Sequence, residues 1–464
     1  MPITNASVRS SGVHHRRATS IADNPKWGAP PVAMSKDPDG RLTAGWRRRC
    51  AEYYRRIIPA HVPAGRVIFL TTPEELAQFV SELRQEKIDV SEVEYVCIVE
   101  PIANLYDIVE FLSLLRDRLP AHAKLITANF NWLMSPLFKV ASSLGVSRRG
   151  PFNNFCRDKD LLSFFDMSGW ECSKEVRRYI LPVPVPVIGK LIDDFFIQLP
   201  YMNVLRASAF FVARKKGSAT HAQHFSVSIL IPCRNEEGNI RAAVVRTPDF
   251  GSSVEFVFIN DKSTDGTEQE IKKCQREFPG RKIVLVQGEG KGKGQAVREG
   301  MKHATGDICM ILDADLTVIP EDLPQFYDAM RFRWADFIHG TRLVYAQEGQ
   351  AMRAANIVGN VFFSHLFSYI LQVRTTDTLC GTKVFWRRDW PLFQEARQLL
   401  ENADVWGDYD LIFGASHFGL KVSQLPVRYF ERLEGVTKMN KRIKNGLVML
   451  RVSALALSKF RFKS

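Results

Sequence analysis

The stretch that most constrains the fold runs from Gly306 to Thr317, with the sequence GDICMILDADLT. The apolar run Ile308–Leu312 stands between polar residues, which is typical of a short strand buried on both faces. The run ends in Asp313-Ala314-Asp315. Side chains at i and i+2 of a strand point to the same side, so we expect the two carboxylates to leave the sheet edge together.

Two neighbouring carboxylates repel each other unless a positive charge lies between them. Mg²⁺ or Mn²⁺ suits this role, because such ions are commonly held by one or two carboxylates together with the phosphate oxygens of a substrate. The alternative is a solvated acidic turn after a core strand, since acidic residues are common in turns. The motif alone leaves both interpretations open, and its sequence context decides between them.

Charge and cysteine distribution narrow the class of protein. The net charge of +13 favours anionic partners such as nucleotides, phospholipid surfaces or nucleic acid. The eight cysteines include no CxxC pair, which argues against a zinc site and against a disulfide framework and fits a reducing cytoplasm. No uncharged apolar run reaches about 18 residues and no signal-peptide core is present, so the sequence predicts neither a spanning helix nor a secretory leader.

Changes in composition divide the chain into four parts. We predict a disordered leader at 1–45, a first α/β domain at 46–218, a second α/β domain at 219–440 and a basic amphipathic tail at 441–464. The leader is rich in Ser, Pro, Gly, Arg and His and has no apolar periodicity. The tail combines basic residues with the apolar segment LVMLRVSALAL, which indicates a helix lying on a membrane surface or packed on its own domain.

The first domain alternates apolar strands with helical segments. Strands are expected at 66–70, 95–99 and 123–128, and helices at 73–85 and 105–118. This alternation indicates a parallel sheet.

Part of this pattern resembles the second half of a class I methyltransferase domain. The segments that carry the resemblance are strand 95–99, the helix IVEFLSLLRDRLP, the strand KLITAN and a strand pair near 177–182 and 207–213. In that family a glycine-rich turn after the first strand holds the cofactor, whereas this chain has FLTTP there. Without glycine the backbone cannot approach a cofactor closely. We therefore expect a degenerate domain that binds no S-adenosylmethionine and serves in docking, dimerisation or membrane contact.

The second domain carries a series of polar motifs at the ends of predicted strands. Strands are expected at 227–232, 255–259 and 283–286, followed by the glycine-rich loop 288–294. A loop with glycine at every second position and two lysines can wrap closely around an anion, although flexible linkers share this composition. The motifs, in order, are IPCRNEEGNI, FINDKSTDGT, GKGKGQAVREG, GDICMILDADLTVIPEDL, HGTRLV, DTLCGTKVF, WGDYDL and RYFERLEGVTKMN.

This ordered set, from about residue 226 to 440, resembles the family 2 glycosyltransferases with a GT-A fold. Within that family it looks most like enzymes that load a sugar from a nucleotide-sugar onto a polyprenyl or dolichyl phosphate. The two resemblances together imply an α/β fold of two domains. A Rossmann-like, truncated methyltransferase-type sheet would be followed by a GT-A nucleotide-diphospho-sugar transferase sheet.

The glycosyltransferase resemblance implies roles for individual residues. Nucleotide-sugar binding is implied for Pro232, Glu236, Asn260, Asp261, Lys291, Lys293, Gly294, Asp313, Ala314 and Asp315. Metal binding is implied for Asp313, Asp315 and Thr317. Acceptor binding is implied for Arg353, Asp377, Gly381 and Asp410, and a catalytic role for Arg342, Asp408, Arg432 and Lys438.

The implied reaction is inverting transfer of a hexose from a UDP- or GDP-sugar. Fixed positive charge from Lys293, Arg342 and Arg432 would stabilise the departing diphosphate. Asp408, ahead of Asp410, would take the proton of a hydroxyl acceptor. A phosphate monoester has a second pKa of about 6 and needs no base. Asp410 is equally compatible with a core-facing acid at a helix start, and both interpretations remain open.

Rival functions remain at this point. The acceptor could be a glycan hydroxyl, or the chain could be a methyltransferase with an accessory second domain, against which the missing glycine loop argues. Nucleic-acid binding is suggested by charge alone, without a basic-aromatic platform. We expect Mg²⁺ or Mn²⁺ as cofactor and a nucleotide-sugar, a lipid-phosphate or glycan acceptor and a membrane surface as partners. We expect no nucleic acid, and a cytoplasmic location, peripheral on the inner face of the cytoplasmic membrane.

Overall fold

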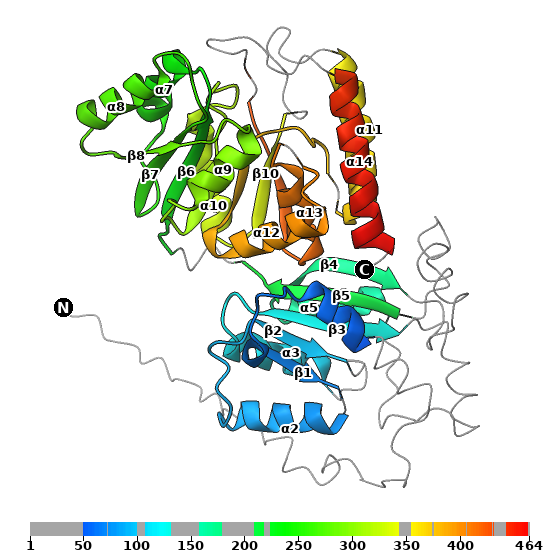
Figure 1. The fold of residues 1–464 in the computed structure, drawn as a ribbon. Helices are drawn as coiled ribbons and strands as arrows, with labels where there is room; N and C mark the ends of the chain where they lie inside the picture. The colour runs from blue at the N-terminus through cyan, green and yellow to red at the C-terminus, as the bar shows by residue number, and fades with distance from the viewer. Residues whose placement is uncertain are drawn as a thin grey trace, which may run out of the picture.

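Two β-sheets, one above the other, organise the chain in the computed structural model (Figure 1). The structure describes residues 50–71, 73–99, 107–130, 157–178, 208–217, 223–342, 354–373, 375–404, 406–428, 430 and 442–462. The expected leader at 1–45 lies outside the described residues, and so do the predicted site residues Arg353, Arg432 and Lys438.

The first sheet has five strands in the order β1-β2-β3-β5-β4. Strands β1 (Val67–Leu70), β2 (Tyr95–Ile98) and β3 (Lys124–Phe130) are parallel. Strand β5 (Ser208–Lys215) runs antiparallel between β3 and β4 (Trp170–Arg178). The predicted parallel sheet is thus confirmed for β1 to β3 and closed on one side by an antiparallel pair.

Apolar side chains on the two faces of this sheet pack against different helices. Buried residues of α2 (Pro73–Arg84), α3 (Ile108–Arg118) and α5 (Asp158–Met167) form the core on one face. Helical residues 50–57 cover the other face, where the Tyr54 hydroxyl donates to the Ile98 carbonyl at 2.7 Å. The resemblance of this domain to a methyltransferase stays a prediction.

The second sheet has seven strands in the order β12-β10-β11-β9-β6-β7-β8. Strand β6 runs parallel to β7 and β9, β7 runs parallel to β8, and β12 runs parallel to β10. Only β11 is antiparallel to its neighbours β9 and β10. The strands are β6 (Ser226–Cys233), β7 (Ser253–Asn260), β8 (Lys282–Gln287), β9 (Ile308–Ile311), β10 (Phe337–Thr341), β11 (Lys383–Trp386) and β12 (Val422–Pro426).

Helices cover both faces of the second sheet. Successive strand residues point to opposite faces, so each buried strand has apolar side chains on both faces that need covering. Leu230 faces one core and Ile229 the other. The first core is completed by α9 (Lys293–Met301), α11 (Ala354–Leu371), α12 (Trp390–Leu399), α13 (Tyr409–His417) and α14 (Arg442–Ala456). The second is completed by α7 (Glu237–Arg246), α8 (Thr267–Glu277) and α10 (Leu323–Arg331).

Short helical turns occur at η2 (Ala64–Arg66), η8 (Pro320–Asp322), η9 (Arg387–Asp389) and η10 (Leu457–Phe462), the last of which is π-helical. The predicted tail helix is α14, and its Met449, Val452 and Ala456 are buried in the first core. Among the described residues, no helix combines the length and the apolar character needed to cross a bilayer.

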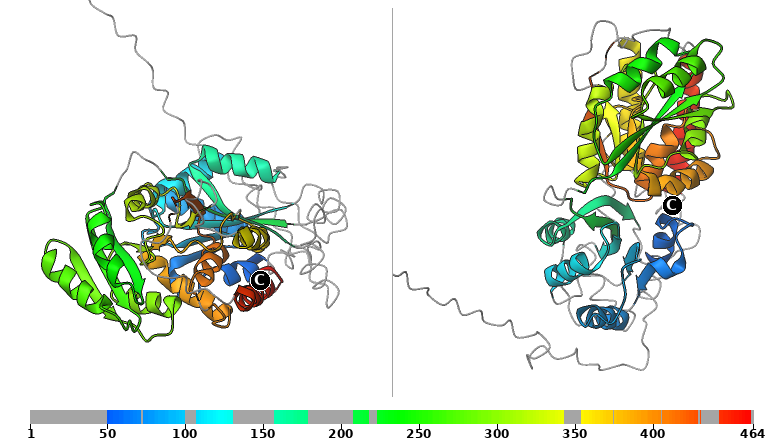
Figure 2. Two further views of the ribbon diagram at one scale, coloured as in Figure 1. Left: turned by 90° about the horizontal axis from the view of Figure 1, so that it is seen from above. Right: turned by 90° about the vertical axis from the view of Figure 1, so that its left-hand side faces the viewer.

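The two domains meet through buried polar contacts, with the first sheet below and the second above in the right-hand view of Figure 2. Arg214 of β5, which is 5% exposed, forms ion pairs with Glu171 and with Asp336. Asp336 precedes β10, and its carboxylate also accepts from the Lys421 amide, which precedes β12, at 2.9 Å. The interface therefore lies at the amino ends of β10 and β12.

One local expectation is wrong. Strand β9 ends at Ile311, so Asp313-Ala314-Asp315 is not an extended continuation of the strand. Instead the chain turns, and Leu316 adopts a positive φ of 51°. The rule that places i and i+2 on one side of a strand does not apply there, and Asp313 and Asp315 have different partners.

Candidate active site

Eight of the predicted site residues lie at or just after the carboxyl ends of β6, β7 and β9, where open α/β sheets bind ligands. Asp313 follows β9, and Lys293 begins α9. Asp408 is the residue before α13, whose first turn reaches the same region. Three segments far apart in sequence thus contribute one charged group each.

These groups form an alternating cluster of two carboxylates and two ammonium groups. The Nζ atom of Lys293 lies 2.7 Å from Oδ1 of Asp313 and 3.7 Å from Oδ1 of Asp408. The Nζ atom of Lys383, at the start of β11, lies 3.4 Å from the same Asp408 oxygen and donates to the Cys380 carbonyl. Lys383 is 0% exposed, and leaving a buried ammonium group without such partners would be costly.

Burial and neighbouring charges act on these pKa values in opposite directions. Burial raises the pKa of Asp408 above its ordinary value, although Lys293 and Lys383 oppose the change. For Asp313 the effect of burial is outweighed by Lys293, and its pKa is lowered. Lys293 has a raised pKa, because Asp313 and Asp408 together outweigh burial. Asp408 therefore holds a proton more readily than an ordinary aspartate, whereas Asp313 stays ionised.

Two glycines permit this close packing. A Cβ atom on Gly381 would lie 1.9 Å from Oδ2 of Asp313 and 2.7 Å from Nζ of Lys293. A Cβ atom on Gly294 would lie 2.8 Å from the backbone nitrogen of Gly407, which itself has a φ of 76°. The start of α9 and the turn before Asp408 therefore touch through their main chains. Any side chain at Gly294 or Gly381 would separate parts of the site.

Arg342 and Asp377 form a bidentate ion pair at the end of β10. The Nε and Nη2 atoms of Arg342 donate to the Asp377 carboxylate at 2.7 and 2.8 Å, and its backbone N–H donates at 3.0 Å. Asp377 is 0% exposed, and although burial would raise its pKa, Arg342 lowers it well below the usual range. Asp377 therefore fixes the guanidinium of Arg342, and its predicted role in acceptor binding stays a prediction.

The glycine-rich loop is organised by Asp261. Its carboxylate accepts from the Gly290 N–H at 2.7 Å and from the Gly292 N–H at 3.0 Å, and the residue is 3% exposed. Beside it, Oδ1 of Asn260 accepts from the Ser263 N–H at 3.0 Å. Lys291 is exposed at the tip of the loop and pairs with Glu289. The loop thus exposes the ammonium group of Lys291, while Asp261 holds the loop backbone through hydrogen bonds.

Pro232 and Glu236 lie at the end of β6 and before α7. Pro232 pairs with Ile259 of β7 in the parallel register. Oε2 of Glu236 accepts from Nδ2 of Asn239 at 2.8 Å, and its backbone N–H donates to Oγ1 of Thr267 at 2.9 Å. Both residues therefore line the same sheet edge as the charged cluster.

Asp410 lies in the core rather than beside Asp408. It is 5% exposed, and its Oδ2 atom lies 3.4 Å from Nη1 of Arg397 and 3.9 Å from Nη1 of Arg298. Burial and the neighbouring Asp404 raise the pKa of Asp410 to about 8. This placement favours the core-facing interpretation over acceptor binding.

Two important residues were absent from the sequence-based set. Lys383 could have been noticed as a lysine that opens the otherwise apolar strand KVFW. Asp404 is 1% exposed and accepts from the backbone N–H groups of Tyr409 and Asp410 at 2.7 and 3.1 Å, so it caps α13. An aspartate before a helix is a recognisable capping signal, but Asp404 lies five residues before Tyr409, the first helical residue that it caps.

The predicted metal ligands offer a suitable donor set. Oγ1 of Thr317 donates to Oδ1 of Asp315 at 2.9 Å, and Asp313 is two residues away in the chain. In the part of the chain that the structure describes, no three His, Cys, Asp or Glu side chains form a metal cluster. Two carboxylates and a hydroxyl are nevertheless oxygen ligands that suit Mg²⁺ or Mn²⁺ when substrate phosphates supply the rest. The residues therefore fit the expected ion.

Comparison with known proteins decides the family of the second domain. The family model described as glycosyl transferase family 2 matches residues 228–390. The chain carries a family 2 glycosyltransferase domain. This stretch holds β6 to β11 and therefore Lys293, Asp313 and Lys383 of the charged cluster.

Curated relatives of the glycosyltransferase domain have related names. A dolichol-phosphate mannosyltransferase of Pyrococcus furiosus is 32% identical over 120 residues, which is 25% of this chain and 33% of that protein. A dolichyl-phosphate beta-glucosyltransferase of Trichomonas vaginalis is 25% identical over 237 residues, or 46% of this chain and 70% of that protein. The chain therefore spans only a third of the Pyrococcus relative that it matches.

Among solved structures, a mannosyltransferase of Pyrobaculum calidifontis, in complex with GDP-Man and Mn²⁺, is similar at 18% identity with a TM-score of 0.36. That match covers 53% of this chain and 70% of the other. The glycosyltransferase resemblance predicted from the sequence is confirmed by the family model for residues 228–390.

Proposed function

We propose that the protein is a metal-dependent inverting glycosyltransferase that moves a hexose from a UDP- or GDP-sugar to a polyprenyl phosphate. The observation that carries this proposal is the alternating cluster of Lys293, Asp313, Lys383 and Asp408 at the carboxyl end of β9. It places two ammonium groups where a sheet of this kind binds ligands. The names of the relatives support a lipid-phosphate acceptor.

The donor side would use fixed positive charge. As the bond between C1 of the sugar and the diphosphate oxygen breaks, its electron pair stays on the leaving nucleotide. Asp313 holds Lys293 and Asp377 holds Arg342, so both cations are already positioned at the carboxyl ends of the strands. Asp313, Asp315 and Thr317 would hold Mg²⁺ or Mn²⁺, which supplies Lewis-acid stabilisation of the diphosphate.

The acceptor side would differ with the acceptor. An oxygen of a phosphate monoester is already anionic at neutral pH, so it can attack C1 from the face opposite the diphosphate without a base. In that case Asp408 would orient the acceptor, and the buried Lys383 beside it would balance the added negative charge.

A second candidate acceptor is a glycan hydroxyl, and one observation favours it. Oδ1 of Asp408 has ion-pair contacts with Lys293 and Lys383 but accepts no hydrogen bond among the described residues, and burial raises the pKa of this carboxyl. A raised pKa improves a general base, because the proton it receives is held more strongly. Asp408 would then take the hydroxyl proton while the oxygen forms its bond to C1.

A peripheral position on the cytoplasmic membrane face is part of the proposal. Helices α11 and α14 lie side by side (Figure 1). Four large apolar side chains on them are exposed: Phe362, Tyr369, Leu447 and Leu450. Leu447 is 62% exposed, and an apolar face of this kind next to the basic residues Arg451 and Lys459 suits an anionic lipid surface.

The test is turnover of a panel of UDP- and GDP-sugars with Mn²⁺ or EDTA, with and without polyprenyl phosphate. Wild type is compared with Asp315→Ala and with Asp249→Ala, in which an exposed aspartate far along the chain is removed as a matched control. Turnover that needs metal and lipid phosphate and is lost only in Asp315→Ala is the expected result.

Other outcomes have definite meanings. Turnover with a glycan but not with lipid phosphate would move the acceptor to a hydroxyl. Absence of turnover and of binding with every nucleotide-sugar would overturn the proposed activity.

A further inference from the structure

Helix α13 connects the candidate active site to the first domain. Asp408 lies at its amino end, and the carboxyl end is at His417, before β12. Nine helical residues span about 13 Å, because each adds about 1.5 Å. The amino ends of β10 and β12, near which α13 ends, form the domain interface.

The carboxyl end of α13 receives unusual support from the first domain. Backbone N–H groups of Gly419 and Leu420 donate to the Ser416 and Ala415 carbonyls, as in a Schellman ending with glycine at positive φ. The backbone carbonyls of His417, Phe418 and Gly419 can then accept hydrogen bonds from other donors. Three side chains of the first domain take them: Lys174 donates to His417 at 2.9 Å, Lys124 to Phe418 at 3.2 Å and Ser173 to Gly419 at 2.7 Å.

A β-bulge in β4 makes this contact feasible. The pairing of β4 with β5 shifts register between Cys172 and Lys174, so Ser173 is an extra residue. A bulge redirects side chains, and here consecutive Ser173 and Lys174 both reach the end of α13. Gly419 also packs closely on β5, since a Cβ atom there would lie 2.8 Å from Cγ1 of Val212.

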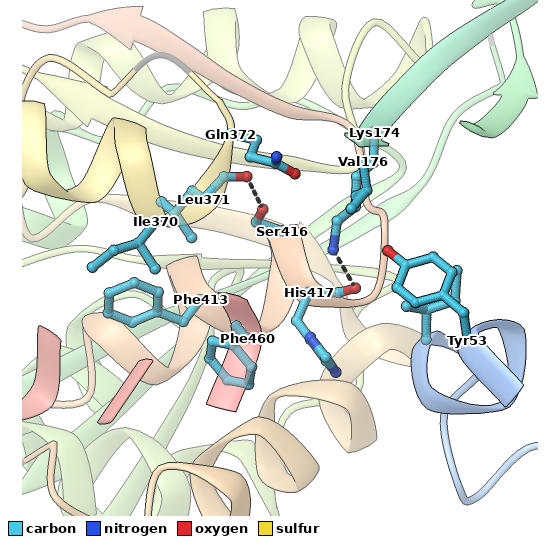
Figure 3. Close-up of a pocket in the computed structure, with 11 residues that line it drawn as sticks. Tyr53, Lys174, Val176, Ile370, Leu371, Gln372, Phe413, Ser416, His417 and Phe460 are labelled. Carbon is cyan, nitrogen blue, oxygen red and sulfur yellow. Dashed lines mark hydrogen bonds between the residues drawn. The ribbon is translucent and has the colours of Figure 1, made fainter. Parts of the chain in front are cut away.

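The surroundings show that this end of α13 is a junction of several elements. Figure 3 shows Lys174 pointing toward the His417 carbonyl, with Tyr53 of the first domain beside it. On the other side, Oγ of Ser416 donates to the Leu371 carbonyl at the end of α11 at 2.8 Å. The His417 ring lies 4.5 Å from the Phe460 ring of η10.

We propose that the first domain positions the candidate active site through α13. Lys124, Ser173 and Lys174 anchor its carboxyl end, and Asp408 at the other end is thereby held between Lys293 and Lys383. Two ammonium groups at the negative end of the helix dipole suit this anchoring role. The proposal rests on the proposed function, because it assigns these three residues to the positioning of a site that transfers sugar.

The test removes the two ammonium groups and keeps their stems. Lys124→Met and Lys174→Met are made singly and together in the full chain, with Lys174→Arg as the conservative variant. Lys216→Met is the matched control, because Lys216 of the same domain pairs with Asp166 on the exposed surface. Hydrogen exchange of peptides within 406–420 is measured together with kcat and with KM for the nucleotide-sugar.

The double variant should exchange faster within 406–420, and its kcat should fall on the order of tenfold, because a small displacement of a reacting group is costly. KM for the donor should change by less than about twofold, since α13 lies beside the donor-binding loops rather than within them. Lys174→Arg should behave as wild type. If the double variant does not fold, the half-buried Lys174→Met alone serves for the same measurements.

Unchanged exchange and unchanged kcat in the variants would overturn the inference. A uniform rise in exchange across both domains, with kcat falling only as far as the folded fraction, would also overturn it. If wild type has no turnover with any donor, the proposed function fails separately. The exchange data then decide the anchoring alone: a rise confined to 406–420 supports it, and no rise overturns it.

Discussion

The ammonium group of Lys293 lies 2.7 Å from the carboxylate of Asp313. Asp313, which is predicted to bind a metal ion, thus already pairs with a positively charged lysine. A divalent ion at Asp313 would have to share this carboxylate with the lysine or displace it. The site would therefore couple two positive groups, the lysine and the ion, through the carboxylate of Asp313, and both could contact the anionic diphosphate of the donor.

Replacing Lys293 should separate metal affinity from turnover. In Lys293→Met, Asp313 loses its competing cation, so Mn²⁺ should bind several-fold more tightly in the absence of nucleotide. Turnover should fall by about 10²- to 10³-fold, the usual cost of losing one group that stabilises transition-state charge. Calorimetry with Mn²⁺ and steady-state kinetics measure the two effects. Lys302→Met, at an exposed lysine just after the same helix, is the control, and equal effects in both variants would contradict the prediction.

Gly381→Ala should disrupt the charged cluster. The new Cβ atom would lie 1.9 Å from Oδ2 of Asp313, so the Lys293–Asp313 pair must move. We expect a loss of about 1–3 kcal/mol in the free energy of unfolding, as for other overpacked sites, and weaker nucleotide-sugar binding. Urea unfolding and calorimetry report the two changes. Gly280→Ala, where the Cβ atom has nothing within 4 Å, should be neutral, and equal losses in both variants would refute the steric argument.

The buried His339 should make stability depend on pH. Burial lowers its pKa from about 6.5 to about 3, and neither ring nitrogen has a hydrogen-bond partner among the described residues. The unfolded chain binds the proton first, so the contribution of the neutral ring to stability is present above pH 6.5. It is lost as the pH falls from 6.5 toward 3, at up to about 1.4 kcal/mol per pH unit.

Urea unfolding of wild type and His339→Leu between pH 7.5 and 4.5 tests this dependence. The difference in unfolding free energy between the two proteins should shift in favour of the variant as the pH falls. His303→Leu, at an exposed histidine, should keep the wild-type dependence. Parallel curves for wild type and His339→Leu would show that the ring does not control this loss.

Asp408→Asn should identify the acceptor chemistry. With a hydroxyl acceptor the base is lost, and kcat should fall by about 10²- to 10⁴-fold. With a phosphate acceptor no base is needed, and kcat should change by only a few-fold. Single-turnover rates with each acceptor class distinguish these results. A large loss with the phosphate acceptor would show that Asp408 does more than orient it.

Sequence patterns predicted the elements that depend on local chemistry. Strand β9 was visible as an apolar run, and the glycine loop as an alternation that the backbone contacts of Asp261 now explain. Residues that act through distant contacts were not predictable in this way. The contact of Lys124 with Phe418 joins residues 294 positions apart, and the periodicity of the sequence carries no information about so distant a pair. Lys383 was missed for the same reason, since its partner Asp408 precedes a separate element, α13.

The backbone contact between Gly294 and Gly407 has a consequence for engineering. Because two main chains touch there, the backbone contact limits how far positions 293 and 408 can separate. A variant library that keeps both glycines should change the residues at 293 and 408 in matched pairs, because an unpaired buried charge is costly, and would still present them to each other. New transfer chemistry could therefore be sought by altering functional groups on a constant scaffold, whereas a methyl group at either glycine would alter the scaffold itself.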